Sequence, residues 1–367
     1  MREVVIASAV RTPVGTFRGA LSATPPSQLA SIVLREAMER AQIEAKDVDE
    51  VIVENALGEQ FGEKPAQQAK SIVGFPDATG VLTINKACGL CLMLAVNAVA
   101  MGYADTVVAG GMENATQAFP SIKNGVAACR IARRRQCAGW TPRCCDRCTL
   151  AMVDRGNVSP EESEMFTFTS HQRALKAITE DKLRSQTVLV ETKGEGDTRI
   201  VVDKDEISAT AKNERVTVSQ FAKVADGAAA LVIMSKEKAE KFGVRPVARV
   251  IAWGLAGNEP EEYLMAPTLA IPKVLKQAGL EAKDIDLYEI DEVCSPATVS
   301  ILKRLGINMS KVNVWGGSLA LGYPLGAVAG ILSTSLLFSM EDQEARTGMI
   351  ALSLGGRDAA SLIVKRL

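Results

Sequence analysis

Apolar residues along this chain fall into two kinds of segment that alternate from one end to the other. Short apolar runs of strand length recur, and longer stretches with helical spacing separate them. This alternation indicates α/β layering with buried, mostly parallel strands. The expected strands are residues 4–10, 106–109, 229–234, 247–252, 312–315 and 350–354. The expected helices are residues 27–40, 92–101 and 327–340.

The middle of the chain, from about residue 119 to residue 225, interrupts this alternation. It is more polar and less periodic than its flanks, and residues 193–214 are strongly charged. We interpret it as an insertion between two related α/β halves. The sequence therefore predicts an N-terminal half at residues 1–118, an inserted loop domain at 119–225 and a C-terminal half at 226–367.

A short repeat supports the idea of two related halves. Residues 41–49 read Ala-Gln-Ile-Glu-Ala-Lys-Asp-Val-Asp, and residues 278–286 read Ala-Gly-Leu-Glu-Ala-Lys-Asp-Ile-Asp. A helical pattern precedes each copy, and a strand-like run follows each one. Because the context repeats together with the motif, we interpret the pair as a duplication rather than a chance match. The helix after Cys88 should then correspond to the helix that starts near Ala327.

Composition narrows the class of protein. The chain has 367 residues, 47% of them hydrophobic and 23% charged, with a formal net charge of −1. That balance gives no reason to expect a nucleic acid as partner. The apolar runs are far shorter than the ~20 residues that span a bilayer, so no membrane partner is expected. No secretory signal is evident at the N-terminus, which predicts a cytoplasmic protein whose eight cysteines are mostly reduced.

Cys88 is the candidate nucleophile. It lies in Asn85-Lys86-Ala87-Cys88-Gly89, between a strand-like run and the apolar helix at 92–101. A cysteine at a helix N-terminus gains from the helix dipole and from free backbone amides, both of which lower its pKa. The alternative is a small buried filler, which is the commoner fate of a free cysteine.

The chain has a single histidine, His171, which limits what Cys88 can do. A nucleophilic cysteine is usually deprotonated by a neighbouring imidazole. His171 lies in the polar stretch Thr169-Ser170-His171-Gln172-Arg173, which has the charge mix of a solvated helix. We therefore expect His171 on the surface.

Two glycine-rich loops follow expected strands. The first, at residues 313–327, contains Gly316, Gly317, Gly322 and Gly326 and leads into a helix. The second is Ser353-Leu354-Gly355-Gly356-Arg357-Asp358. Loops of this kind present backbone amides to an anion or a carbonyl oxygen, although each is a weak signal alone.

Taken together, these segments resemble the thiolase family, the acetyl-CoA acetyltransferases and 3-ketoacyl-CoA thiolases. The resemblance covers most of the chain and fails only at about residues 120–150. It implies a duplicated five-layer α/β/α/β/α fold with a loop domain between the halves, and an acyl group carried on Cys88. The matching segments are Ser8-Ala9-Val10-Arg11-Thr12-Pro13, Asn85-Lys86-Ala87-Cys88-Gly89, Ala109-Gly110-Gly111-Met112-Glu113, Ser170-His171-Gln172-Arg173-Ala174, Asp226-Gly227-Ala228-Ala229-Ala230 and the loop at 313–327.

The resemblance also carries expectations about ligands and partners. It implies an acyl-CoA thioester as substrate, no other cofactor, and a homodimer or homotetramer, since closed symmetry is the norm for such chains. Cys88, Tyr323, Ser353 and Asp291 are the expected catalytic residues. The expected substrate-binding residues are Gly317, Gly322, Gly355, Gly356 and Glu292.

Several positions depart from the family pattern around the nucleophile. Gly322-Tyr323-Pro324 replaces Gly-His-Pro, Ser353 replaces a cysteine that serves as acid and base, and Asp291-Glu292-Val293-Cys294 replaces Asn-Glu-Ala-Phe. Cys88-Gly89-Leu90-Cys91 stands for Cys-Gly-Ser-Gly, and Ala222-Lys223 for a Ser-Gly that touches coenzyme A. The nucleophile is retained, while its usual helpers are replaced.

The replacements have their own chemistry. Tyr323 has an ordinary pKa near ~10, so a neutral phenol can donate a hydrogen bond but does not easily accept a proton. Asp291 or Glu292 could act as a base if partly desolvated. Two hypotheses follow. The first is a thiolase-type acyltransferase with altered helpers; the second is a non-catalytic protein of this fold that binds acyl-CoA or supports an active subunit.

A cysteine cluster lies in the expected insertion. Cys145 and Cys148 have Cys-x-x-Cys spacing, and a zinc site would need two more ligands from the neighbouring thiols. The irregular spacing favours a divergent surface loop with free thiols, and a local change of reading frame is a third interpretation. The cluster consists of Cys129, Cys137, Cys144, Cys145 and Cys148.

Overall fold

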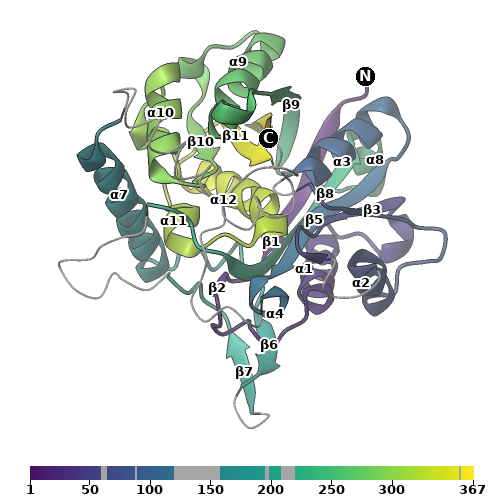
Figure 1. Cartoon of the computed structure of the whole chain (residues 1–367). Helices are drawn as coiled ribbons and strands as arrows, with labels where there is room; N and C mark the ends of the chain where they lie inside the picture. The colour runs from purple at the N-terminus through teal and green to yellow at the C-terminus, as the bar shows by residue number, and fades with distance from the viewer. Residues whose placement is uncertain (59–63, 87–88, 120–157, 195–197, 208–219, 355–356) are drawn as a thin grey trace.

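A single mixed sheet runs through the computed structural model (Figure 1). One part contains, in spatial order, β4 (Gly80–Ile84), β3 (Glu50–Glu54), β5 (Thr106–Asn114), β8 (Ala225–Ser235) and β1 (Val4–Arg11), with β2 (Gly15–Thr16) beside β8. The other contains β9 (Ala248–Gly257), β12 (Asp358–Arg366), β11 (Thr347–Leu354) and β10 (Leu287–Ile290). The structure describes residues 1–58, 64–86, 89–119, 158–194, 198–207, 220–354 and 357–367.

The two parts of the sheet meet at a short junction. Only Val5 with Arg249 and Ile6 with Ala248 pair across it, between β1 and β9. The division of the chain at residues 118 and 225 stays a prediction. However, β8, which begins at the second boundary, pairs with β1 and β5. This strand of the predicted C-terminal half therefore lies among the N-terminal strands of the sheet.

The prediction that the strands are mostly parallel is wrong. Parallel pairing joins β3 to β4, β3 to β5 and β10 to β11. The remaining named pairs in this sheet are antiparallel. The physical reason is that helices cover both faces, so most strands are apolar throughout, and such a run does not reveal its direction. Strand β12, which pairs antiparallel with β11, was not predicted.

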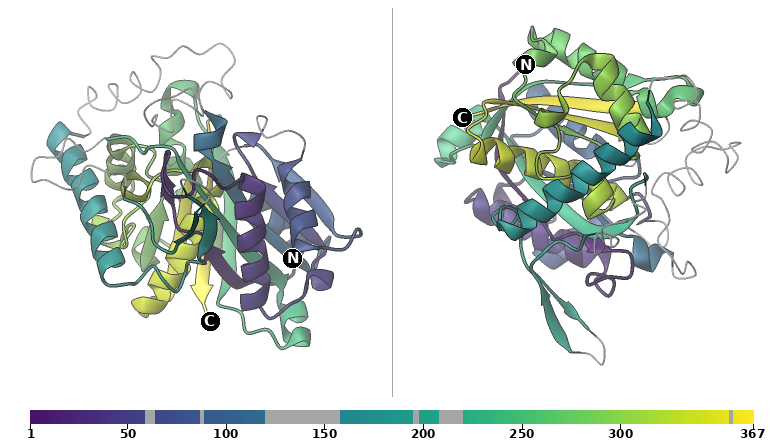
Figure 2. Two further views of the ribbon diagram at one scale, coloured as in Figure 1. Left: turned by 90° about the horizontal axis from the view of Figure 1, so that it is seen from below. Right: turned by 90° about the vertical axis from the view of Figure 1, so that its left-hand side faces the viewer.

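Helices form three layers around the two parts of the sheet (Figure 2). Outside the N-terminal strands lie α1 (Pro26–Arg40) and α2 (Pro65–Val73). In the middle lie α3 (Leu90–Met101) and α12 (Val328–Asp342). Outside the C-terminal strands lie α9 (Pro267–Ala278) and α10 (Ser295–Leu305). The predicted five-layer α/β/α/β/α fold is confirmed.

The central position of α12 follows from two close approaches. Gly330 of this helix lies against Ala229 of β8, while Leu336 and Met340 lie against Gly348 of β11. A side chain at either glycine would collide with its neighbour. α12 therefore packs on both parts of the sheet at once.

The sequence repeat has the same local structure in both copies. The 3₁₀ turns η1 (Ala45–Asp47) and η5 (Ala282–Asp284) each begin with a reciprocal capping box, Glu44 with Asp47 and Glu281 with Asp284. Two residues further on, Asp49 Oδ2 accepts the amides of residues 105 and 106, and Asp286 Oδ2 accepts those of residues 346 and 347. These equivalent contacts confirm that the two segments are related.

One predicted strand is absent, and its sequence forms a turn. At 312–315 only Val312 pairs, in an isolated bridge with Tyr288. Asn313 has a φ of 46° and Gly316 a φ of 80°, so the backbone turns away from the sheet at both residues. The prediction failed because a buried apolar turn has the same composition as a short strand.

The described part of the middle segment contributes a long helix and a hairpin. Helix α7 (Pro160–Thr179) packs on α10 and on α11 (Ser318–Leu321). Strands β6 (Val190–Lys193) and β7 (Arg199–Val202) form a hairpin that extends from the body of the molecule (Figure 1). The remaining short helices are α4 (Ala115–Ala118) and α8 (Lys236–Phe242). Within the described residues, none of the helices has the length and apolar character needed to cross a membrane.

Candidate active site

Three of the four predicted catalytic residues lie together at the carboxyl ends of β10 and β11. The Tyr323 hydroxyl donates a hydrogen bond to Oδ2 of Asp291 at 2.7 Å. The backbone amide of Ser353 donates to the same oxygen at 3.2 Å. Because β10 and β11 are parallel, Asp291 and Ser353 leave the sheet at the same edge. The glycine-rich loop brings Tyr323 to this edge from a different part of the chain.

Asp291 is a buried carboxyl group with a raised pKa. Only 3% of the residue is exposed, and Oδ1 makes no hydrogen bond within the described part of the chain. Burial raises the pKa of Asp291 to about 7, and the nearby Glu292 carboxylate adds to the rise. The hydrogen bonds from Tyr323 and Ser353 oppose it by favouring the charged form. A carboxyl group with a pKa near 7 has the titration range that general acid and base catalysis at neutral pH requires.

Glu292 makes different contacts, although it is the next residue. Its Oε1 accepts the Asn313 side-chain amide at 2.7 Å. Its Oε2 accepts the Ser170 hydroxyl at 2.8 Å and the Leu319 amide at 3.0 Å. The carboxylate thus ties α7 to the loop that carries Tyr323. Substrate binding by Glu292 stays a prediction, and its observed contacts are those of an internal anchor.

The glycine amides of the 313–327 loop bond within the protein. Gly316 and Gly322 donate to the carbonyls of Asn313 and Ser318. Gly317 donates to the Ser170 hydroxyl at 3.1 Å, and Gly326 to Oε2 of Glu113 at 3.1 Å. These contacts fix the shape of the loop, and the amides of Gly317 and Gly322 donate to protein acceptors. Substrate binding by these two glycines stays a prediction.

Gly322 shows why the loop needs glycine next to Tyr323. Its φ is 107°, and a side chain there would strike Ala225 at the start of β8. Beside it, the Tyr323 amide donates to the carbonyl of Lys223 at 2.7 Å. The backbone of Tyr323 is therefore held against the strand entering β8, and its side chain points back to Asp291.

The predicted nucleophile, Cys88, lies outside the described residues, as do Gly355 and Gly356. Its neighbour Gly89 is described and has a φ of 124°. Gly89 lies against the side chains of Leu352 and Ala329. Leu352 directly precedes Ser353, and Ala329 belongs to the first turn of α12. The N-terminus of α3 therefore adjoins the edge of the sheet that carries Ser353 and Asp291.

An ion pair links the two halves beside this edge. Nζ of Lys86, in the segment that leads to Cys88, lies 2.5 Å from Oδ2 of Asp358, at the start of β12. Both side chains are 36% exposed. The pair joins the approach to α3 in one half to the start of β12 in the other.

His171 is buried, so the prediction of a surface histidine is wrong. Its Nδ1 donates to the Thr167 carbonyl at 3.0 Å, and only 5% of the residue is exposed. Burial lowers the pKa of His171, and the charge of Lys223 lowers it further. The polar sequence of α7 was misleading because the helix buries a stripe of small residues, Ser163, Thr167, Ser170 and Ala174, against α10 and α11.

Sequence analysis gave no role to three residues that shape the site. Asn313 donates to Glu292 and also binds the backbone of Ile290 with both atoms of its side-chain amide. Ser170 joins Glu292 to Gly317. Glu113 holds Gly326 and the amide of Ala56. All three lie in segments that match the thiolase pattern, and that membership was the only sequence signal for them.

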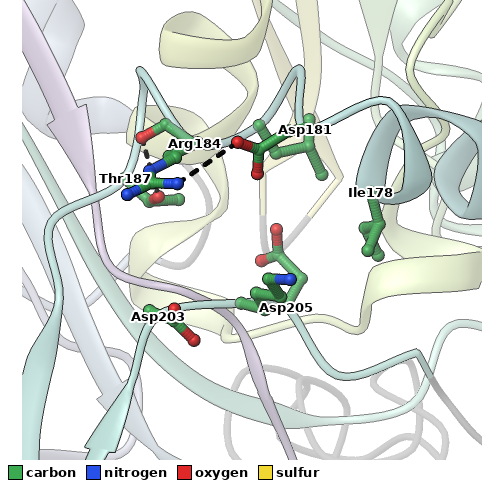
Figure 3. A pocket seen from close by; sticks show the side chains of 8 residues that line it. Ile178, Asp181, Arg184, Thr187, Asp203 and Asp205 are labelled. Atoms are coloured by element: carbon green, nitrogen blue, oxygen red, sulfur yellow. Dashed lines mark hydrogen bonds and ion pairs between the residues drawn. The ribbon is translucent and has the colours of Figure 1, made fainter.

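A separate pocket lies where the middle segment meets the N-terminal strands (Figure 3). Its lining residues include Asp181, Arg184, Thr187, Asp203 and Asp205. Asp205 forms a buried ion pair with Arg11 at 2.6 Å. The cavity holds only about 10 Å³, the scale of one water molecule, so we assign it no substrate.

Comparison with protein families identifies the chain. The model of the thiolase N-terminal domain matches residues 4–237, and that of the thiolase C-terminal domain matches residues 244–366. The chain belongs to the thiolase family. This thiolase is 33% identical to an acetyl-CoA acetyltransferase of Syntrophomonas wolfei, over 100% of both chains. It is 32% identical to one of Schizosaccharomyces pombe, over 100% of this chain and 99% of that protein.

Solved structures agree with this assignment. The thiolase superposes on the acetyl-CoA acetyltransferase of Bacillus anthracis with a TM-score of 0.88 and 29% identity, over 100% of this chain and 99% of that one. A human mitochondrial 3-ketoacyl-CoA thiolase has the same fold, with a TM-score of 0.85 at 24% identity. The protein is a thiolase-type acyltransferase, and the comparisons give no support to a catalytically impaired relative over that enzyme.

Proposed function

We propose that this thiolase carries an acyl group from an acyl-CoA thioester on Cys88, and that Asp291 and Tyr323 move the protons. The observation that carries the proposal is the 2.7 Å hydrogen bond between Tyr323 and a buried Asp291 whose pKa is about 7. A carboxyl group with this pKa performs the task usually given to an imidazole. The full-length similarity to acetyl-CoA acetyltransferases supports acetyl-CoA as one substrate.

Acylation consists of proton transfers between Cys88, Tyr323 and Asp291 and the exchange of one thioester bond for another. The Cys88 thiol gives its proton to the Tyr323 oxygen while the Tyr323 hydroxyl proton passes to Asp291. The Cys88 sulfur forms a bond to the thioester carbonyl carbon, and the bond to the sulfur of coenzyme A breaks. The departing thiolate then recovers the proton from Asp291 through Tyr323. Reversing these steps returns the acyl group to coenzyme A.

The second half-reaction needs acid and base catalysis on carbon. In the condensing direction a proton leaves the α-carbon of a second acyl-CoA, and that carbon attacks the acyl-Cys88 carbonyl, releasing the Cys88 thiolate. Asp291 in its charged form is the proposed acceptor of this proton. The Ser353 amide fixes Asp291 for the task, and the Ser353 hydroxyl is proposed to contact the substrate.

The remaining predictions belong to this proposal. Gly355 and Gly356 are proposed to bind the substrate beside Ser353, with Gly317, Gly322 and Glu292 shaping the loop opposite. We further propose a homodimer or homotetramer that acts in the cytoplasm, without nucleic acid or membrane partners. The related proteins include both cytosolic and mitochondrial forms. Any role of the Cys129–Cys148 cluster, zinc included, concerns residues outside the described part of the chain.

Intact-protein mass spectrometry tests the proposal. After incubation with acetyl-CoA, we expect a mass increase of one acetyl group that is lost in Cys88→Ser. Cys294→Ser is the matched control, because Cys294 is a buried cysteine outside any disulfide, three residues from Asp291, and its replacement should leave the adduct intact. An unmodified wild-type protein, or an adduct that persists in Cys88→Ser, would show that acyl transfer through Cys88 is wrong.

A further inference from the structure

The N-terminus of α3 is occupied by a buried carboxyl group from β3. Oε2 of Glu54, the last residue of β3, accepts the Gly89 amide at 2.8 Å. The amides of Leu90 and Cys91 and the Cys91 thiol also hydrogen-bond to the Glu54 carboxylate and lower its pKa. Glu54 is fully buried. The sequence predicted free amides here, but the amides of Gly89, Leu90 and Cys91 already have the Glu54 carboxylate as acceptor.

No residue of α3 itself provides this cap. Its N-cap residue is Gly89, which has no side chain, and its first turn contains no acidic residue. The helix therefore receives its N-terminal acceptor from a distant strand. Cys88 is the residue immediately before Gly89 in the chain, so Glu54 binds the helix end next to the proposed nucleophile.

A carboxylate at this place changes what the helix can do for the cysteine. The N-terminus of a helix carries about half a positive charge, which ordinarily favours an adjacent thiolate. A full negative charge on Glu54 more than cancels it, and the buried carboxylate is shielded from the water that would screen the repulsion. Oε1 of Glu54 makes no hydrogen bond to the described residues, which further disfavours the charged form.

We propose that Glu54 is a positioning residue that sets the ionisation of Cys88, so that the N-terminus of α3 carries one negative charge at a time, on Glu54 or on Cys88. The inference rests on the proposed role of Cys88. It means that Cys88 is a neutral thiol at rest and that its proton must be removed by a base during acylation. The Asp291–Tyr323 pair is the proposed base.

The surrounding groups are consistent with this balance. Burial raises the pKa of Glu54 to about 7 in spite of the amides. The Cys91 thiol, which bonds to Glu54, has its pKa raised well above the usual range by burial and by the charge of Glu54. Glu113 of β5 lies nearby but binds the amides of Ala56 and Gly326. The Lys86 ammonium is paired with Asp358.

The experiment is the rate of alkylation of Cys88 by iodoacetamide as a function of pH, without acyl-CoA. Fragment-ion mass spectrometry assigns the label, because Cys91 lies on the same tryptic peptide. In the wild-type protein we expect the rate to rise with a midpoint above the ordinary thiol pKa of about 8.5. A midpoint below that value would mean that the helix activates Cys88 in spite of Glu54, and would overturn the inference.

Variants make the test specific. Glu54→Gln should move the midpoint down by about one pH unit or more, with the largest gain in labelling rate above pH 7, where Glu54 is charged in the wild type. Glu54→Asp keeps the charge and should stay close to wild type. Asp226→Asn is the matched control, since Asp226 is also buried, has a pKa of about 7 and binds the first amides of a different helix, α4. It should leave the Cys88 curve unchanged.

Two results with the Glu54→Gln variant would also overturn the inference. A Glu54→Gln curve that overlaps the wild-type curve would make Glu54 a structural cap only, and a shift to higher pH would make it a base. Either result leaves the proposed function intact if acetyl-CoA still modifies wild type but not Cys88→Ser. Loss of that adduct with the expected alkylation shift would instead contradict the proposed function alone.

Discussion

The Tyr323 hydroxyl and the Asp291 carboxylate share a hydrogen bond of 2.7 Å in a buried site. The contact joins the glycine-rich loop after residue 313 to the carboxyl end of β10. The Tyr323 hydroxyl therefore acts on the pKa of Asp291, which it lowers. A phenol cannot replace an imidazole as a base, but a phenol bonded to a carboxyl group with a pKa of about 7 can pass a proton to it.

Removing the Tyr323 hydroxyl should change the pH dependence of the reaction. Tyr323→Phe deletes a donor that favours charged Asp291, so the pKa of Asp291 should rise above about 7. The acidic limb of the kcat/KM profile should move to higher pH, with a loss of about tenfold or more at pH 7. Tyr288→Phe is the control: Tyr288 is equally buried, but its hydroxyl bonds to the Ala282 carbonyl, and its profile should not move. Equal effects of both changes would mean that Tyr323 serves only packing.

Stability should fall as pH rises through neutrality. Burial raises the pKa values of Asp291, Glu54 and Asp226 to about 7 and that of Glu113 to about 8. These values lie above those of the unfolded chain, near 4. The folded state therefore holds extra protons, and its stability declines between about pH 4 and pH 8 as they are lost. We expect a higher Tm at pH 5.5 than at pH 8.5, and a Tm that rises over that interval would contradict the assignment.

Neutralising Glu292 should destabilise the fold. Glu292→Gln keeps the shape but places an amide donor where donors from Asn313, Ser170 and Leu319 now converge. We expect a loss of about 1–3 kcal/mol in the free energy of unfolding, measured in urea. Glu281→Gln, an exposed position in the 3₁₀ turn before β10, should change little. An unchanged midpoint for Glu292→Gln would show that this carboxylate does not anchor the loop.

The Lys86–Asp358 pair should affect activity more than stability. The pair is about one-third exposed, so breaking it should cost less than about 1 kcal/mol. Lys86→Asp should nevertheless lower kcat/KM by about tenfold, because it releases the segment that leads to Cys88. Adding Asp358→Lys restores the opposite charges and should recover most of the rate. No recovery in the double variant would mean that the ion pair does not position this segment.

Much of the fold was predictable because its signals are local. The predicted helix at 27–40 and the predicted strands at 4–10 and 350–354 correspond to α1, β1 and β11, whose bounds are Pro26–Arg40, Val4–Arg11 and Thr347–Leu354. The repeated Glu-Ala-Lys-Asp turns revealed the duplication. Strand direction and the turn at Asn313 were not predictable. Both depend on contacts between segments distant in sequence, such as the bond from Asn313 to Glu292.

The proximity of three candidate site residues was predictable, but the hydrogen bonds around them were not. The motifs named Tyr323, Asp291 and Ser353 as catalytic residues, and the structure brings these three together. The burial of His171 and the capping of α3 by Glu54 could not be seen, because each depends on which face of an element is covered. The sequence does not reveal that a polar residue is buried when its hydrogen-bond partners lie on a distant segment.

The pH profile of thiolytic turnover in wild type and Asp291→Asn tests the central claim most directly. Wild type should show an acidic limb with an apparent pKa near 7, set by Asp291. Asp291→Asn should turn over about 10²–10⁴-fold more slowly and lose that limb, while Asp286→Asn at the other end of β10 should keep both rate and limb. An Asp291→Asn enzyme with wild-type turnover at pH 7 would contradict the account, because another group would then be the base.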